Sequence, residues 1–183
     1  NAFEDGDQVV VESIVYDDFP SIGPDDDFAQ VDFDKVPEGI LHRCRLDLSR
    51  ESVQTERISN RTCEFAMVNP QRQGLSARYA WMAVTERESG NDPLQAIQKL
   101  DLATGSTHTW SAAPRGFVSE PLMVRRPGAD SEDDGWVLDL VWNGARASSD
   151  LVILDARDLS EVAVLELPLA VPHGLHGSWA GAS

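Results

Sequence analysis

The chain has 183 residues, which is long enough for one domain with a sizeable core, and its 42% hydrophobic and 25% charged residues are the balance of a folded protein. No apolar run approaches the ~20 residues of a membrane-spanning helix. The net charge of −16 argues against nucleic acid as a partner, because phosphates would repel it.

The first eight residues, NAFEDGDQ, are acidic and lack the apolar segment of a signal peptide, so we expect a cytoplasmic protein. Because the first residue is Asn rather than Met, we also expect the natural chain to begin further upstream. The two cysteines, Cys44 and Cys63, match neither a disulfide framework nor a zinc motif. Two reduced thiols are therefore expected.

Residues 1–40 form an acidic segment in which we expect strand and loop. They hold twelve acidic residues and one basic residue, Lys35, and so carry −11 of the net charge. The run at 25–27 (DDD), followed by Asp32 and Asp34, is a candidate calcium site. It lacks the glycine and the terminal glutamate of an EF-hand loop, so a solvated acidic loop is the stronger prediction.

A repeat of 54 residues organises the rest of the chain. Its copies are 46–48 (LDL), 100–102 (LDL) and 154–156 (LDA). Each copy has the pattern of a strand, a short polar turn and a second strand, and the turn is clearest at 103–105 (ATG).

Further strands are predicted between the copies, at 79–84 and 136–142, and the second follows a turn signal at 131–135. No long stretch shows the 3.6-residue apolar period of an amphipathic helix. Each period therefore holds about four short strands, which is typical of a large β-propeller blade.

The predicted fold is all-β, with about three propeller blades across residues 1–183. Closed propellers have about 4–8 blades, so three would leave open edges. We expect the chain to be part of a longer protein, with closure by self-association as the alternative. A generic β-sandwich is a third possibility, which the 54-residue period disfavours.

Three polar side chains follow nearly the same period. Glu64, Glu120 and His176 are separated by 56 residues and again by 56. Each is predicted to open the strand after a hairpin, and equivalent positions on the inner strands of blades converge on the propeller axis. Neutral imidazole is a good ligand for iron, copper or zinc, and a glutamate can ligate or can accept the other ring N–H of a histidine ligand. The alternative is that the glutamates are solvated and that His176 hydrogen-bonds a neighbouring loop.

The C-terminal stretch VPHGLHGSWAGAS holds two histidines, each followed by a glycine. We expect Gly174 and Gly177 to let the backbone approach the axis without a Cβ clash. Side chains three residues apart point to opposite faces of an extended strand. Because His176 keeps the 56-residue step from Glu120 and His173 does not, His176 is the predicted metal ligand.

Several ordered stretches carry a resemblance to a known family. They are 63–65 (CEF), 91–96 (NDPLQA), 117–124 (FVSEPLMV), 126–128 (RPG), 132–136 (EDDGW), 149–156 (SDLVILDA) and 171–177 (VPHGLHG). Together they resemble the C-terminal half of a carotenoid cleavage oxygenase, in particular the cyanobacterial-type apocarotenoid 15,15′-oxygenases. The resemblance spans the chain from about residue 8.

The resemblance implies a seven-bladed propeller with an axial non-haem Fe(II) held by four histidines, behind which stand three glutamates. It implies that His176 is the last iron ligand and that Glu64 and Glu120 are two of those glutamates. The other three histidine ligands would lie upstream, and His42 and His108 match no ligand position. The implied reaction adds O2 across a double bond of a carotenoid or apocarotenoid and yields aldehydes such as retinal, with no catalytic residue beyond the metal site.

The sequence departs from the family at two positions. Ala66 stands where proline is usual, which we expect to loosen the loop that carries Glu64. His173 replaces an aromatic residue and adds an imidazole near the site. Candidate linings of an apolar substrate tunnel are Phe65, Phe117, Trp142 and Trp179, although aromatic residues in strands more often belong to the core.

With one ligand of four, the chain is expected to be inactive alone, and the missing N-terminal half would provide any peripheral membrane contact. The alternative function is a non-enzymatic binding or assembly module with a vestigial axial site. Three upstream histidines at blade-like intervals would decide for the enzyme.

Overall fold

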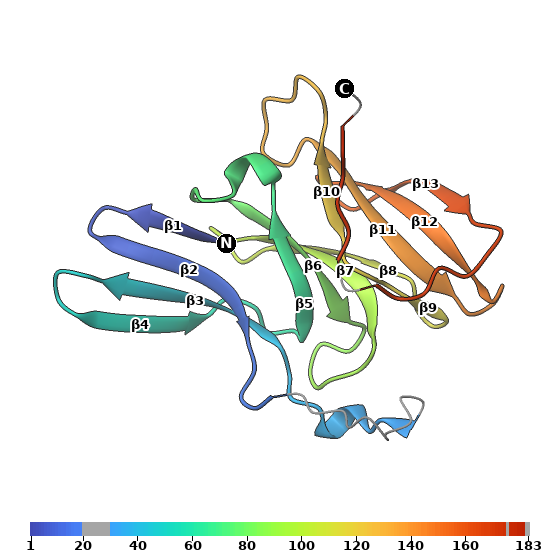
Figure 1. The fold of residues 1–183 in the computed structure, drawn as a ribbon, viewed down its shortest axis with the longest axis horizontal. Coiled ribbons are helices and arrows are strands. Elements are labelled where there is room, and N and C mark those ends of the chain that lie inside the picture. The colour runs from blue at the N-terminus through green and yellow to red at the C-terminus, as the bar shows by residue number, and fades with distance from the viewer. Residues whose placement is uncertain (20–29, 175, 182–183) are drawn as a thin grey trace.

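A computed structural model describes residues 1–19, 30–174 and 176–181. These residues form three antiparallel sheets of four main strands each, side by side in Figure 1 and here called blades 1, 2 and 3. Blade 1 contains β1 (Ala2–Asp5), β2 (Gln8–Val15), β3 (Ile40–Asp47) and β4 (Ser52–Arg57). Blade 2 contains β5 (Cys63–Val68), β6 (Tyr79–Thr85), β7 (Leu94–Asp101) and β8 (Thr107–Ser111). Blade 3 contains β10 (Leu122–Arg125), β11 (Gly135–Asn143), β12 (Ser148–Asp155) and β13 (Glu161–Glu166), and β9 (Gly116–Phe117) pairs with β11.

The predicted all-β fold of about three blades is therefore confirmed, and the predicted strands at 79–84 and 136–142 are β6 and β11. Apart from Gln30, helical structure in the described residues is confined to two 3-10 turns, η2 (Phe33–Lys35) and η3 (Pro70–Arg72). No helix among these residues is long and apolar enough to cross a membrane.

The 54-residue repeat corresponds to one turn that recurs in every blade. Asp47, Asp101 and Asp155 end β3, β7 and β12. The Oδ1 atom of each aspartate accepts backbone N–H groups two or three residues further on, from residues 49 and 50, from 103 and 104, and from 157. An aspartate that bonds its own turn in this way stabilises the hairpin, which explains why the repeat is visible in the sequence.

Apolar side chains fill the spaces between the blades. Between blades 2 and 3 the buried residues are Trp81, Ala83, Ile97, Val118, Met123, Val137, Val141, Val152, Leu154, Ala156 and Leu159. A second cluster centres on Leu41 of blade 1 and on Met82 and Val84 of blade 2. Both cysteines are free, as expected, and burial raises the pKa of the Cys63 thiol to about 11. The blades thus pack face to face, as in a propeller.

One buried cation joins blades 2 and 3. The Nζ atom of Lys99, on β7, lies 2.6 Å from Asp133 Oδ2 and donates to the Arg157 carbonyl at 2.7 Å. The same nitrogen lies 4.1 Å from the centre of the Tyr79 ring. The loop between β10 and β11 and the turn after β12 are thereby tied to the face of blade 2.

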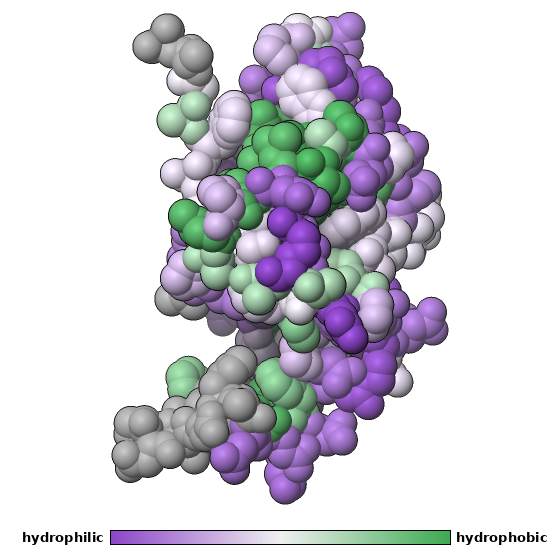
Figure 2. Space-filling model, turned by 90° about the vertical axis from the view of Figure 1, so that its right-hand side faces the viewer, coloured by the Kyte–Doolittle hydropathy of each residue, from purple (hydrophilic) through white to green (hydrophobic). Residues whose placement is uncertain are grey.

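The outer side of blade 3 is apolar and partly exposed, and the C-terminal segment lies across the part near Leu140 and Leu151. Figure 2 shows apolar side chains gathered on this side of the molecule. The register of β11, β12 and β13 sets Leu140, Leu151 and Leu165 in one row, and Leu165 remains 49% exposed. A contiguous apolar face of this kind is typical of an interface.

The acidic run at 25–27 lies outside the described residues. Of the two acids that follow it, Asp32 pairs with Lys35 at 2.9 Å, and Asp34 pairs with Arg87 of blade 2 at 3.2 Å. Both flanking acids are therefore engaged by cations of the chain.

Candidate functional site

The three predicted site residues lie in different secondary structure, one in a strand and two outside strands. Glu64 lies in β5, the first strand of blade 2. Glu120 stands two residues before β10, and His176 lies in the segment that follows β13. The expectation that each opens a strand is therefore correct only for Glu64. Pro121, which follows Glu120, has no N–H to pair, and the glycine-rich C-terminal segment has no partner strand among the described residues.

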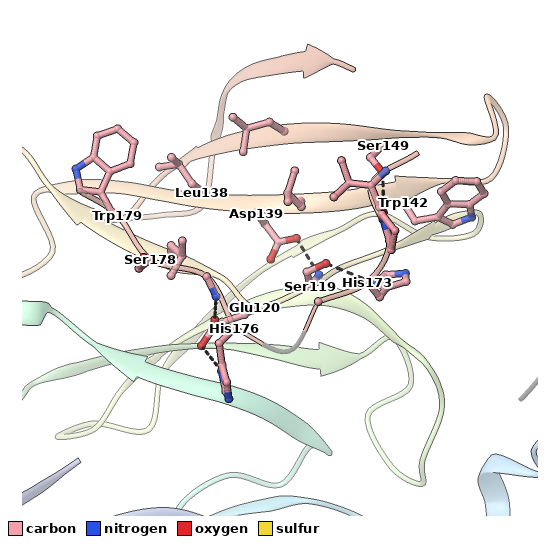
Figure 3. A pocket seen from close by; sticks show the side chains of 17 residues that line it. Ser119, Glu120, Leu138, Asp139, Trp142, Ser149, His173, His176, Ser178 and Trp179 are labelled. Atoms are coloured by element: carbon pink, nitrogen blue, oxygen red, sulfur yellow. Dashed lines mark hydrogen bonds and ion pairs between the residues drawn. The ribbon is translucent and has the colours of Figure 1, made fainter. Parts of the chain in front are cut away.

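Glu120 and His176 are in direct contact (Figure 3). Oε1 of Glu120 lies 3.3 Å from Nδ1 of His176, and Oε2 accepts the backbone N–H of Gly177 at 2.6 Å. A carboxylate only accepts, so the ring contributes its Nδ1–H. In the neutral imidazole this places the Nε2 lone pair on the side away from Glu120, and 76% of the side chain is exposed. This arrangement is the one required of a histidine that is to bind a metal through Nε2.

A β-bulge in β5 brings Phe65 of blade 2 to the His176 ring. The pairing of β5 with β6 shifts register between Glu64 and Met67, and Phe65 adopts a left-handed φ of 54°. The Phe65 ring consequently meets the His176 ring edge to face, with centroids 6.1 Å apart. Bulges and left-handed non-glycine residues gather at functional sites, where they re-aim side chains.

Glu64 lies beside this contact but not in it. Its Oε2 accepts the backbone N–H of Phe65 at 3.1 Å, and burial raises the pKa of its carboxyl. Among the described residues no hydrogen bond joins Glu64 to a histidine. The structure thus brings Glu120 and His176 into contact. Glu64 immediately precedes Phe65, whose ring meets that of His176.

His173 takes a different direction from His176. Its Nδ1 lies 3.4 Å from the Ser119 hydroxyl, one residue before Glu120. The expected role of the two glycines is only partly correct. A Cβ added at Gly174 would meet nothing within 4 Å, whereas at Gly177 it would lie 3.3 Å from Leu122 Cδ1. Only Gly177 makes the close approach that was expected, and neither glycine has a positive φ.

Sequence reasoning missed one residue of the site, Asp139. This side chain, in the middle of β11, is 2% exposed and accepts the backbone N–H of Ser119 at 3.0 Å (Figure 3). Burial raises the pKa of its carboxyl to about 7, and the nearby Glu120 contributes to the increase. The available signal was an acid at a core-facing position of an otherwise apolar strand, between Val137 and Val141.

A hollow of about 300 Å³ touches Glu120 and Gly177 from the side of Ala66 and Met67. Two more hollows adjoin the site. The smaller, of about 380 Å³, lies between blade 3 and the C-terminal segment and includes Glu120, Asp139 and both histidines. The larger, of about 790 Å³, is a mainly apolar groove that includes Glu64 and His173. Among the four candidate tunnel aromatics, Phe117 lines the larger hollow, Trp179 the smaller and Trp142 both. Phe65 packs against the core and against His176 instead.

The described residues offer a metal one positioned imidazole. They contain no group of three or more His, Cys, Asp or Glu side chains that could hold an ion. His42 lies on β3 and His108 on β8, within blades 1 and 2 and away from the two larger hollows. The donor set therefore suits one ligand position of a larger site.

Comparison with known proteins gives consistent matches over the whole chain. The family model of the retinal pigment epithelial membrane protein matches residues 1–181. The apocarotenoid-15,15′-oxygenase of Synechocystis sp. is 42% identical over 182 residues, which cover 98% of this chain and 37% of that protein. Lignostilbene-alpha,beta-dioxygenase isozyme III of Sphingomonas paucimobilis is 30% identical over 203 residues, which cover 100% of this chain and 40% of that protein. The chain thus spans well under half the length of these relatives.

Solved structures agree with this result. The crystal structure of the cobalt-substituted Synechocystis apocarotenoid oxygenase matches with a TM-score of 0.95 at 41% identity, and the match covers 100% of this chain and 38% of that one. The three blades therefore correspond to part of a seven-bladed propeller.

Proposed function

Because the chain belongs to the family of the retinal pigment epithelial membrane protein and the carotenoid cleavage oxygenases, we propose that it forms part of an iron-dependent dioxygenase. Its substrate would be a carotenoid or apocarotenoid, cleaved with O2 at one double bond of the polyene to aldehydes such as retinal. The observation that carries the proposal is the contact between Glu120 and His176, at 3.3 Å from Oε1 to Nδ1.

In this proposal His176 supplies one ligand through Nε2. Glu120 accepts the Nδ1–H, fixes the tautomer and raises the basicity of the ring. The second oxygen of Glu120 holds the Gly177 amide, so that ring and backbone are aimed by the same carboxylate. The iron would supply the activation of O2, and its other histidine ligands would come from outside residues 1–183.

Glu64 and Phe65 have separate roles in this account. The Phe65 ring packs at right angles to the imidazole, with ring centroids 6.1 Å apart, and forms one wall beside it. The carboxylate of Glu64, half-buried beside it, is available to a histidine from another part of the propeller. The larger groove, which Phe117 and Trp142 line, offers apolar surface for a polyene, whose burial contributes about 25 cal/mol per Å².

A chimera tests the proposal. Residues 1–183 would replace the matching segment of the Synechocystis apocarotenoid oxygenase, with residues 1–183 alone as the control. We expect the chimera to bind one equivalent of iron and to cleave an apocarotenoid, and the chain alone to do neither. A folded chimera without iron or product would contradict the proposal and favour a non-enzymatic module.

A further inference from the structure

The turn that carries Glu120 is fastened to blade 3 by a single buried carboxyl group. We propose that Asp139 is a positioning residue, which holds the turn of Ser119 and Glu120 and through it orients the imidazoles of His176 and His173. The inference rests on the proposed function for its purpose, although the contacts that carry it are independent of any metal.

The position of Asp139 is unusual for an acid. It alternates with Val137 and Val141 on the face of β11 that packs into the core between blades 2 and 3. No ion pair joins it to a cation among the described residues, and its Oδ2 is buried there without a hydrogen-bond partner. Burial of a carboxyl with one oxygen unpaired costs free energy that an apolar residue would avoid. Departures of this kind from the apolar pattern of a strand are expected at functional sites.

The contacts of Asp139 lead directly to the two histidines. Its Oδ1 accepts the Ser119 N–H at 3.0 Å. The Ser119 hydroxyl lies 3.4 Å from His173 Nδ1, and the next residue, Glu120, engages both the His176 ring and the Gly177 amide. Ser119 and Glu120 make the two histidine contacts, and one hydrogen bond from the centre of β11 therefore holds the turn that carries both.

Two substitutions separate positioning from structure. Leucine has nearly the shape of aspartate and suits the apolar surroundings, but it cannot accept the Ser119 N–H. Asparagine retains one acceptor oxygen. D139L should therefore fold and yet release the turn, whereas D139N should retain it. D150N is the matched control, because Asp150 is a buried acid on β12 whose partners are Arg146 and Asn143.

The experiment is amide hydrogen exchange on the full chain, combined with ¹⁵N shifts of the His176 ring. In D139L we expect exchange of the Ser119 and Gly177 amides to rise about tenfold, as the loss of one such hydrogen bond gives, with core amides of β11 and β12 unchanged. The His176 ring should also lose its single tautomer. D139N and D150N should leave Gly177 and His176 as in the wild type.

The proposal is overturned if Gly177 and His176 are unchanged in D139L. It is equally overturned if exchange of the core amides of β11 and β12 increases as much as exchange of Gly177. Asp139 would then be a purely structural residue. D139V, a smaller strand-forming substitution, is the second apolar variant, and unfolding of both D139L and D139V would count against positioning. Failure of the chimera to bind iron, by contrast, would contradict the proposed function and leave this inference standing.

Discussion

At the level of single residues, the direction of the His176 ring determines what the site can do. Glu120 occupies Nδ1, so only Nε2 is available to a metal. His173, three residues earlier, turns toward Ser119 instead. The two imidazoles lie close in sequence but have different hydrogen-bond partners. Substitutions at each histidine can therefore distinguish their roles.

We expect His176→Ala, in the chimera with the Synechocystis oxygenase, to abolish iron binding and cleavage together, because it removes a ligand. His173→Tyr restores the aromatic residue usual in the family and should preserve iron and most of the turnover. Metal analysis and product formation measure both variants. Loss of iron from His173→Tyr with iron retained in His176→Ala would reverse the assignment.

Glu120→Gln should reduce turnover in the same chimera without unfolding it. Glutamine can still accept from Nδ1–H but lacks the charge that polarises the ring, and losses of this type typically cost about 10–100-fold. Initial rates and iron content, compared with those of the exposed control Glu161→Gln, measure the effect. Equal rates and equal iron in Glu120→Gln and wild type would rule out this role for Glu120.

Asp139 should make stability depend on pH. Its pKa rises from an ordinary value of 3.8 to about 7 on folding, so the native state binds this proton more tightly than the unfolded state. The stabilisation is fully present below about pH 4 and is lost as the pH rises through about 7. Asp139→Asn stays neutral, so its Tm should increase relative to wild type between about pH 5 and pH 8. A Tm difference that does not vary with pH would show that folding does not raise the pKa of Asp139.

Much of the candidate site could be predicted from residue spacing, because blades repeat their positions. The 56-residue steps pointed to Glu120 and His176, which the structure brings into contact. Asp139 was missed, since its role depends on a contact with Ser119 twenty residues away, which no periodicity encodes. The direction of His173 depends likewise on a tertiary contact.

At the level of elements, the sequence predicted best where local chemistry decides. Each repeated aspartate bonds its own turn, so the strands before it could be placed from the sequence. The bulge in β5 could not be placed, because the left-handed conformation of Phe65 is imposed by packing rather than by its own preference. The expected strand at His176 is not formed, because a strand needs a hydrogen-bonded neighbour and the described residues give this segment none.

The contact between blades 2 and 3 predicts a stability effect at Lys99. Lys99→Met would leave Asp133 without its partner at a position where the lysine side chain is only 5% exposed. Removal of one partner of such a buried pair typically costs about 3 kcal/mol. Urea unfolding measures the loss, with Lys35→Met, which breaks the exposed pair with Asp32, as a control expected to show no change. Equal midpoints for the two variants would mean that the pair does not join the blades.

At the level of the whole molecule, the structure is a set of three blades, and the outer face of blade 3 is apolar and partly exposed among the described residues. Three blades, one imidazole held by Glu120 and two carboxylates are what the proposed axial metal site would require of this part of the propeller. The chain matches 37% of the length of the Synechocystis relative. The repeat period made this architecture predictable, whereas the shape of the groove, which depends on loops from several blades, was not.

The proposed function requires that His176 bind the metal through Nε2 while Glu120 accepts the Nδ1–H. The most direct test is a crystal of the iron-loaded chimera, measured with anomalous scattering at the iron edge. We expect an anomalous peak bonded to His176 Nε2, with Glu120 at hydrogen-bond distance from Nδ1. A peak bonded to His173 or to Glu120, or one away from His176 altogether, would contradict it.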